Sequence, residues 1–161
     1  MKYIQAFLVL HVLSLSASTA QAQLRIGIHA GADAGPDAIT LGVHASYPVG
    51  HSGVYVVPSV SYGFGSQRIQ GEEFDFKSYR GSVRGVYPIP LDRSNDFVFA
   101  PQAGPAVYHQ SFNNCSGDPA CSPTGFGVNI GAGMRFAAFS VTAMAGIGDL
   151  PDASVWIGLA F

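Results

Sequence analysis

The chain has 161 residues, of which 48 % are hydrophobic and only 11 % are charged, and its formal net charge at pH 7 is −2. Soluble domains usually carry roughly 25 % charged residues, so this composition argues against an ordinary soluble globular domain. The small negative charge implies no general attraction to nucleic acid, and the length suits a single domain.

Residues 1–22 have the three parts of a secretory signal peptide. Lys2 supplies the positive charge, Phe7 to Leu15 form the apolar stretch, and Ala20-Gln21-Ala22 fits a small-residue cleavage site. The alternative is an N-terminal anchor helix, but the apolar run is much shorter than the ~20 residues that a spanning helix needs. We therefore expect cleavage after this segment and one mature domain over residues 23–161.

From residue 24 onward, apolar residues alternate with polar or small ones, and turn residues interrupt the alternation. Such period-2 patterning places successive side chains on opposite faces of a strand. In chain order, the pattern predicts eight strands over residues 24–32, 39–47, 54–64, 74–88, 97–109, 126–136, 139–147 and 153–161.

The predicted connections alternate in length. Those after the first, third and fifth strands carry more polar residues, and the longest cover residues 65–73 and 110–124. Those after the second, fourth and sixth strands are mostly short. An even number of strands with this alternation is typical of membrane barrels that have short periplasmic turns and longer outer loops.

Two local features qualify this pattern. Phe74 and Phe76 break the alternation of their strand, which predicts a bulge or a free rim there. Every Asp and Glu is assigned to a loop, a turn or a strand rim, with Asp33 in the first loop. We therefore expect no inward-facing carboxylate at the centre of a strand.

The side-chain sizes on the two faces decide which face is outside. A soluble barrel such as a lipocalin has its apolar face inside, whereas a membrane barrel has it outside. Eight strands enclose only enough space for side chains to fill. Here the apolar faces carry large residues and the opposite faces are rich in Gly and Ser, so the sequence predicts an all-β, eight-stranded antiparallel up-and-down transmembrane β-barrel.

Aromatic residues gather near both ends of the predicted strands, as they do at the two membrane interfaces of such barrels. One group is expected at the periplasmic ends: Tyr47, Tyr87, Phe97, Phe136, Phe139 and Phe161. The other is expected at the outer ends: Tyr62, Phe64, Tyr79 and Phe126.

The whole mature chain resembles the small eight-stranded outer-membrane β-barrel proteins, in the porin-like superfamily that includes the barrel domain of outer-membrane protein A. The resemblance rests on the signal peptide, the alternating strands and the terminal Phe161. It implies a bacterial outer-membrane location, contact with outer-membrane lipid, and recognition of the C-terminal strand and Phe161 by the barrel-assembly machinery. Members of this superfamily include structural anchors, adhesins, small pores and a few lipid-modifying enzymes.

Six cationic or titratable side chains are expected to face the lumen: Arg25, Arg80, Arg84, Arg135, His29 and His44. One interpretation is a cationic lumen that holds a small anion or favours anions along a narrow path. The other is a polar network, in which arginines bond to Tyr55, Asn129, Asp92, Asp96, serines, carbonyls and water, or stack on Tyr55 or Trp156. We favour the network, because polar networks commonly plug small barrels.

Cys115 and Cys121 enclose only five residues inside the longest loop. Because an exported protein folds in an oxidising compartment, we expect a disulfide between them that stiffens the loop. Two thiols alone make a poor metal site, and we expect neither a metal nor a cofactor.

His109 and Ser111 resemble the His-x-Ser pair of outer-membrane lipid A deacylases, which also have eight strands. Such a pair uses serine as the nucleophile and histidine as the base, with an acid that orients the histidine. No Asp or Glu starts the facing strand, and the nearest acid in the sequence is Asp118. We therefore expect no enzyme.

The sequence favours a monomeric barrel with a structural or surface-interaction role, in which the loops at residues 65–73 and 110–124 contact an unidentified surface ligand. The alternatives are a narrow anion-favouring pore and, with less support, a lipid A hydrolase.

Overall fold

The computed structural model describes residues 24–35, 37–69, 72–113 and 122–160. The described chain forms strands in the order β1 (Arg25–Ala34), β2 (Asp37–Pro48), β3 (Tyr55–Ile69), β4 (Glu72–Val86), β5 (Ile89–Pro90), β6 (Phe97–Phe112), β7 (Thr124–Phe136), β8 (Phe139–Gly148) and β9 (Ala153–Ala160). In these ranges, no helix is long and apolar enough to cross a membrane.

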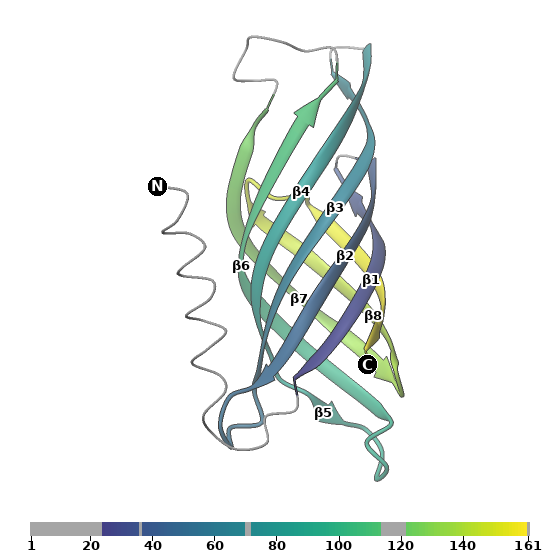
Figure 1. The fold of residues 1–161 in the computed structure, drawn as a ribbon, viewed down its shortest axis with the longest axis vertical. Coiled ribbons are helices and arrows are strands. Elements are labelled where there is room, and N and C mark those ends of the chain that lie inside the picture. The colour runs from purple at the N-terminus through teal and green to yellow at the C-terminus, as the bar shows by residue number, and fades with distance from the viewer. Residues whose placement is uncertain (1–23, 36, 70–71, 114–121, 161) are drawn as a thin grey trace.

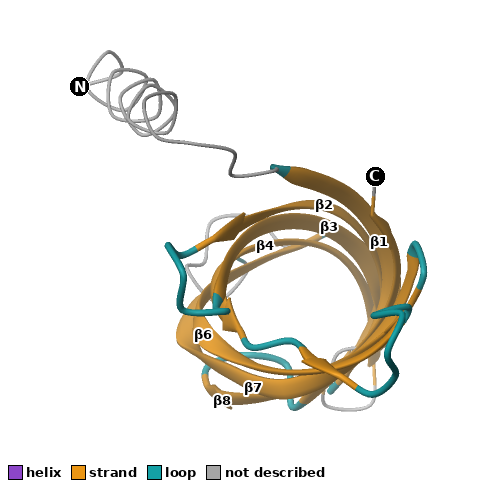
Figure 2. Cartoon of the chain, turned by 90° about the horizontal axis from the view of Figure 1, so that it is seen from below, coloured by secondary structure: helices purple, strands orange, loops and turns teal. Residues whose placement is uncertain are grey.

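The strands close into a barrel. Each long strand pairs antiparallel with its neighbours in the chain, β9 pairs with β1, and β4 pairs directly with β6. The two-residue strand β5 pairs only with the start of β6 and lies outside the ring of eight. Figure 1 shows the tilted strands from the side, and Figure 2 shows the ring along its axis. The predicted eight-stranded antiparallel barrel is confirmed.

Large apolar side chains cover the outside of the barrel, as the alternation predicts. The exposed aliphatic residues include Ile26, Ile28, Ile39, Leu41, Val43, Val60, Val83, Val107, Val128, Ile130, Val141, Ile147, Val155 and Ile157. The buried polar residues include His29, Asp33, Thr40, Ser59, Ser78, Arg80, Ser82, Arg84, Gln102, Gln110, Asn129 and Ser154. An apolar exterior around a polar interior is the arrangement of a membrane barrel, because lipid rather than water solvates the outer face.

Aromatic side chains form a belt near each end of the barrel. At the end where β1 begins, here called the lower end as in Figure 1, the exposed aromatics are Tyr87, Phe97, Phe99, Phe136 and Phe139. At the upper end they are Tyr62, Phe64, Tyr79 and Phe126. Tyr62 and Tyr79 pack with ring centroids 5.4 Å apart. The upper group is found as predicted, and so are Tyr87, Phe97, Phe136 and Phe139 of the lower group. Tyr47 of the lower group is half-buried, and Phe161 lies outside the described residues.

The upper strand ends are longer than the sequence suggests. β3 continues to Ile69 and β4 begins at Glu72, so most of the segment expected as a loop over residues 65–73 is strand. The register of β3 and β4 is continuous along this hairpin, so the bulge expected at Phe74 and Phe76 was wrong. On the other edge of β4, the pairing with β6 ends at Phe76, which leaves a free rim at Phe74. Phe76 instead points inward, is 1 % exposed, and packs against Phe112 at 5.8 Å between ring centroids.

The assignment of Asp33 to a loop was also wrong. β1 continues to Ala34, and Asp33 pairs in register with Ala38 of β2 and Ser154 of β9. Its side chain faces the interior, and the residue is 3 % exposed. The interior therefore contains a carboxylate, held one residue from the end of β1 rather than at the centre of the strand. The predicted signal peptide over residues 1–22 and the predicted Cys115–Cys121 disulfide lie outside the described residues.

Candidate functional site

Trp156 of β9 lies at the centre of the lumen contacts. Its ring stacks on the His29 imidazole with centroids 4.9 Å apart. The Arg80 guanidinium carbon lies 5.4 Å from the centre of the indole, and that of Arg84 lies 5.1 Å away. Both arginines therefore lie within cation–π distance of one indole, which confirms stacking on Trp156 as one of the expected arrangements.

Arg80 reaches across the lumen to one carboxylate and one hydroxyl, each on another strand. Its Nη2 donates to Asp33 Oδ2 at 2.9 Å, and its Nη1 donates to Ser154 Oγ at 3.0 Å. Its guanidinium carbon also lies 5.5 Å from the Tyr108 ring centre. The two side chains of the Arg80–Asp33 ion pair are 4 % and 1 % exposed. This arginine thus has a counter-ion that sequence reasoning missed.

Arg84 has different partners. Its Nη1 donates to Gln102 Oε1 at 2.7 Å and to Met144 Sδ at 3.7 Å. Arg84 is 5 % exposed. Within the described residues, no carboxylate forms an ion pair with it. Arg84 is therefore a buried cation held by neutral groups and an aromatic face.

The two predicted lumen histidines lie together. His29 Nδ1 and His44 Nδ1 are 3.4 Å apart, and the ring centroids are 5.6 Å apart. At this distance one ring can donate to the other when the tautomers are complementary. The strand register explains the pair, because Gly27 lies opposite His44 and Gly42 lies opposite His29, which leaves space for each ring.

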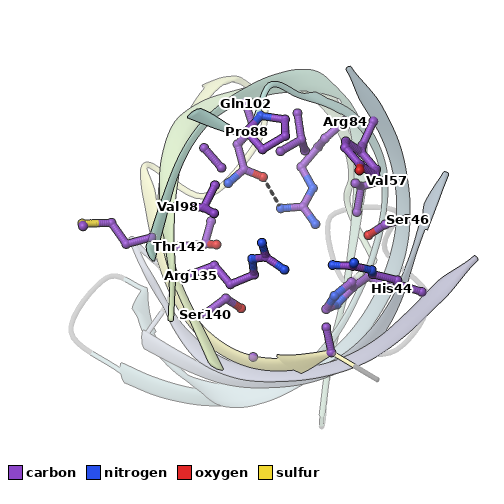
Figure 3. A pocket seen from close by; sticks show the side chains of 18 of the residues that line it. His44, Ser46, Val57, Arg84, Pro88, Val98, Gln102, Arg135, Ser140 and Thr142 are labelled. Carbon is purple, nitrogen blue, oxygen red and sulfur yellow. Dashed lines mark hydrogen bonds between the residues drawn. The ribbon is translucent and has the colours of Figure 1, made fainter. Parts of the chain in front are cut away.

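A cavity opens into the lower half of the lumen and brings five of the six predicted residues together. This lower cavity has a volume of about 400 Å³. Its lining includes Arg25, His29, His44, Arg84 and Arg135, together with Gln102, Thr142 and Trp156. Figure 3 shows Arg84, Arg135 and His44 directed into the space from different parts of the barrel wall. Arg80, the sixth residue, does not line this cavity.

Arg25 and Arg135 lie near the lower mouth. Arg25 is the first residue of β1 and is exposed. Arg135 Nη2 donates to the Asn95 backbone oxygen at 3.4 Å, in the turn before β6. The expected partner Asp92 instead accepts from the Ser94 hydroxyl at 2.7 Å and from the Phe97 backbone N–H at 3.3 Å. These hydrogen bonds, led by that of Ser94, lower the pKa of the exposed Asp92 carboxyl.

The residues that sequence reasoning missed are Asp33 and Gln102 as arginine partners and Tyr108 as an arginine-facing ring. Gln102 and Tyr108 lie on the inward face of β6, so alternation could have placed them in the lumen. Among the described residues, no group of three His, Cys, Asp or Glu side chains could hold a metal ion.

His109 lies on the outward face of β6 near the upper aromatic belt. Its Nδ1 lies 2.8 Å from the Thr124 hydroxyl, and its ring is 6.4 Å from that of Tyr79. A hydrolase histidine needs an acid to orient it. In the described structure a neutral hydroxyl occupies this position.

No protein-family model matches the chain, and no curated protein matches its sequence. Its structure is similar to the N-terminal β-barrel domain of Pseudomonas aeruginosa OprF, with 19 % identity, a TM-score of 0.55, and coverage of 88 % of this chain and 100 % of that one. Neisserial surface protein A matches with 12 % identity, a TM-score of 0.52, and coverage of 86 % and 95 %. Together with the closed ring of strands and its apolar exterior, these likenesses give the chain the fold of the small eight-stranded barrels of the outer membrane.

Proposed function

We propose that this protein is an integral β-barrel of the bacterial outer membrane, and that its role is structural or depends on surface interactions at the upper end of the barrel. The main support is the hairpin of β3 and β4. This hairpin continues beyond the upper aromatic belt, and the side chains on its outer face change in character there. Tyr62 and Tyr79 pair within the belt, and one step higher on the outer face Phe64 pairs with the exposed Lys77. Above this level Ser66 pairs with the exposed Asp75. A charged outer face suits water rather than lipid, so the hairpin is suited to contact a ligand outside the membrane.

The shape of the barrel supports the same proposal. The strands β3, β4 and β6 have 15, 15 and 16 residues, whereas β1, β8 and β9 have 10, 10 and 8. Figure 1 shows the longer strands rising above the turns that connect β1 to β2 and β8 to β9. One side of the barrel therefore extends further from the membrane than the other, and offers paired strands rather than loops alone as a contact surface.

The interior supports a closed barrel over the alternative of a narrow pore. Arg80 bridges β4 to Asp33 on β1 and Ser154 on β9, and the Trp156 indole lies beside it. These contacts cross the lumen, so an ion would have to displace a buried ion pair to pass. We therefore expect that a planar bilayer containing this protein shows no stable current steps.

Two measurements test the proposal: the side of the membrane on which each end of the barrel lies, and the conductance of the protein in planar bilayers. An epitope inserted between Ile69 and Glu72 should be labelled by antibody on intact cells, because the proposal puts this hairpin outside. An epitope inserted after Arg93, in the turn at the opposite end, serves as the matched control and should be labelled only after permeabilisation. Labelling in the reverse order would contradict the proposal. In planar bilayers the protein should be silent, whereas anion-selective steps that vanish in Arg84→Ala would support the pore.

A further inference from the structure

We propose that the lower cavity is a binding site for a small oxyanion of the phosphate or sulfate type, held by Arg84 and Arg135. The site needs only the closed barrel and does not depend on the proposed surface role. Three observations carry it: the charge of the cavity lining, the lack of a counter-ion for Arg84, and the buried N–H groups around it.

The lining of the cavity is cationic without compensation. Arg25, Arg84 and Arg135 line it along with two histidines, and its described lining includes neither Asp nor Glu. Low-dielectric walls with charges of one sign focus the field and raise the local concentration of an ion of opposite charge. The cavity therefore attracts anions, although the whole chain has a formal net charge of −2.

Arg84 and Arg80 form an internal comparison. Both are 5 % exposed, and both lie close to the Trp156 indole. Arg80 has Asp33 as its counter-ion at 2.9 Å, whereas no described carboxylate pairs with Arg84. A buried charge is unfavourable unless it is paired. A bound anion would neutralise the buried charge of Arg84, as Asp33 neutralises that of Arg80. The cavity is lined by Arg84 and not by Arg80.

Hydrogen-bond donors around Arg84 are also without protein partners. The N–H groups of Arg84 Nε and Trp156 Nε1 are buried and make no hydrogen bond in the described structure. His29 Nε2 is also buried without a partner, and it donates when it carries the ring proton. All three residues line the lower cavity. Buried donors normally have a partner, either in the protein or in a bound molecule. Arg80 Nε is unpartnered too, but Arg80 does not line the cavity, so only the nitrogens of Arg84, Trp156 and His29 are available to an acceptor bound there.

Arg135 supplies a second cation from a different wall. Its one described hydrogen bond is a long one of 3.4 Å to the Asn95 backbone oxygen. Figure 3 shows its guanidinium and that of Arg84 directed into the same space. Gln102 is joined to Arg84 by a hydrogen bond, and Thr142 and Ser140 lie along the wall near Arg135. Planar guanidinium groups bind tetrahedral oxyanions through paired N–H···O bonds. The volume of about 400 Å³ fits a small ligand.

Nuclear magnetic resonance of the folded, full mature chain in zwitterionic detergent tests this site. The protein has a single tryptophan, so the indole N–H resonance reports on Trp156 alone. Inorganic phosphate and sulfate, each added at constant ionic strength in place of chloride, should shift this resonance saturably. Arg84→Gln and Arg135→Gln should each weaken the apparent phosphate affinity at least tenfold. Arg93→Gln is the matched control, because Arg93 is exposed in the lower turn and does not line the cavity.

A shift that stays linear with phosphate concentration, an equal shift with chloride, or the same loss of affinity in Arg93→Gln would overturn the proposal. Folding of each variant is checked by its amide spectrum. If Arg84→Gln does not fold, the titration of the unsubstituted protein and of Arg135→Gln still decides, because Arg135 makes only the one long hydrogen bond described above.

Discussion

Arg80 of β4 and Asp33 of β1 form an ion pair of 2.9 Å across the lumen, although β2 and β3 separate their strands in the sheet. The pair joins β4 to β1 across the lumen. Arg80 also donates to Ser154 at 3.0 Å, on β9, the strand directly opposite β4 in the ring. Tyr108 and Trp156 flank the guanidinium. These contacts cross the interior with charged, polar and aromatic groups, where a soluble domain would have an apolar core.

Removal of the carboxylate should strongly destabilise the barrel. Asp33→Ala leaves Arg80 buried without its counter-ion, and breaking a buried pair costs about 3–5 kcal/mol. Urea unfolding in lipid vesicles measures this change. Asp37→Ala removes an exposed carboxylate on the neighbouring strand and should change stability little. A double variant that also carries Arg80→Met should recover part of the loss, whereas equal losses in Asp33→Ala and Asp37→Ala would contradict the account.

Alanine should destabilise the barrel when it replaces Gly31 but have little effect when it replaces Gly85. A Cβ on Gly31 would collide with the Trp156 side chain and with the Val155 backbone oxygen, so Gly31→Ala should destabilise the barrel by about 1–3 kcal/mol. Gly85 faces outward, and its added Cβ would meet only the Ala103 backbone oxygen at 3.8 Å. Gly85→Ala should therefore be close to neutral. The free energies of unfolding of the two variants can be compared directly, and equal values would refute the packing of Trp156 against β1.

A charge on the middle of the outer face should oppose membrane insertion. Val60 is 59 % exposed on β3, between the two aromatic belts. Val60→Arg places a charge in the apolar belt and should cost about 2–4 kcal/mol in a bilayer. Leu91 is similarly exposed, in the lower turn, and Leu91→Arg should cost about 1 kcal/mol or less. A soluble barrel would show the opposite trend, because water would solvate an arginine at residue 60.

The turn at Asp92 should show a small pH dependence. The Ser94 hydroxyl and nearby backbone N–H groups stabilise the ionised carboxylate and lower its pKa. A lowered folded-state pKa favours folding above the ordinary carboxyl range, and this contribution is lost as the pH falls through the folded-state value. In Ser94→Ala, the carboxyl titration of Asp92, followed by carbon NMR, should move to higher pH. An unchanged titration would show that Ser94 does not hold the carboxylate.

Local patterns in the sequence were sufficient to predict the ring of strands and which face of the ring is outside. Alternation fixes which side chains share a face, and turn residues separate the strands, so the outward aliphatic residues and both aromatic belts could be predicted. The inward position of the lumen arginines and histidines follows from the same parity. These features depend only on residues that are close together in the chain.

The contacts inside the lumen could not be predicted, because they depend on distant strands. Asp33 precedes Gly35, Pro36 and Asp37, a composition typical of a loop. Only Arg80, from three strands away, explains why its carboxylate lies inside. The inward position of Phe76 also depends on another strand. Phe76 breaks the alternation expected of a half-buried strand, but in the structure its ring packs against Phe112 in the upper lumen. The pairing of Arg84 with Gln102 likewise depends on how the barrel closes between β4 and β6.

The central claim is that the apolar face of this barrel meets lipid. The most direct measurement is electrophoretic mobility, with and without boiling, of the protein in separated inner-membrane, outer-membrane and soluble periplasmic fractions. We expect the protein in the outer-membrane fraction, with a different mobility after boiling, because closed membrane barrels often stay folded in cold detergent. A soluble periplasmic protein with one mobility in both samples would contradict the claim and reverse the assignment of the two faces.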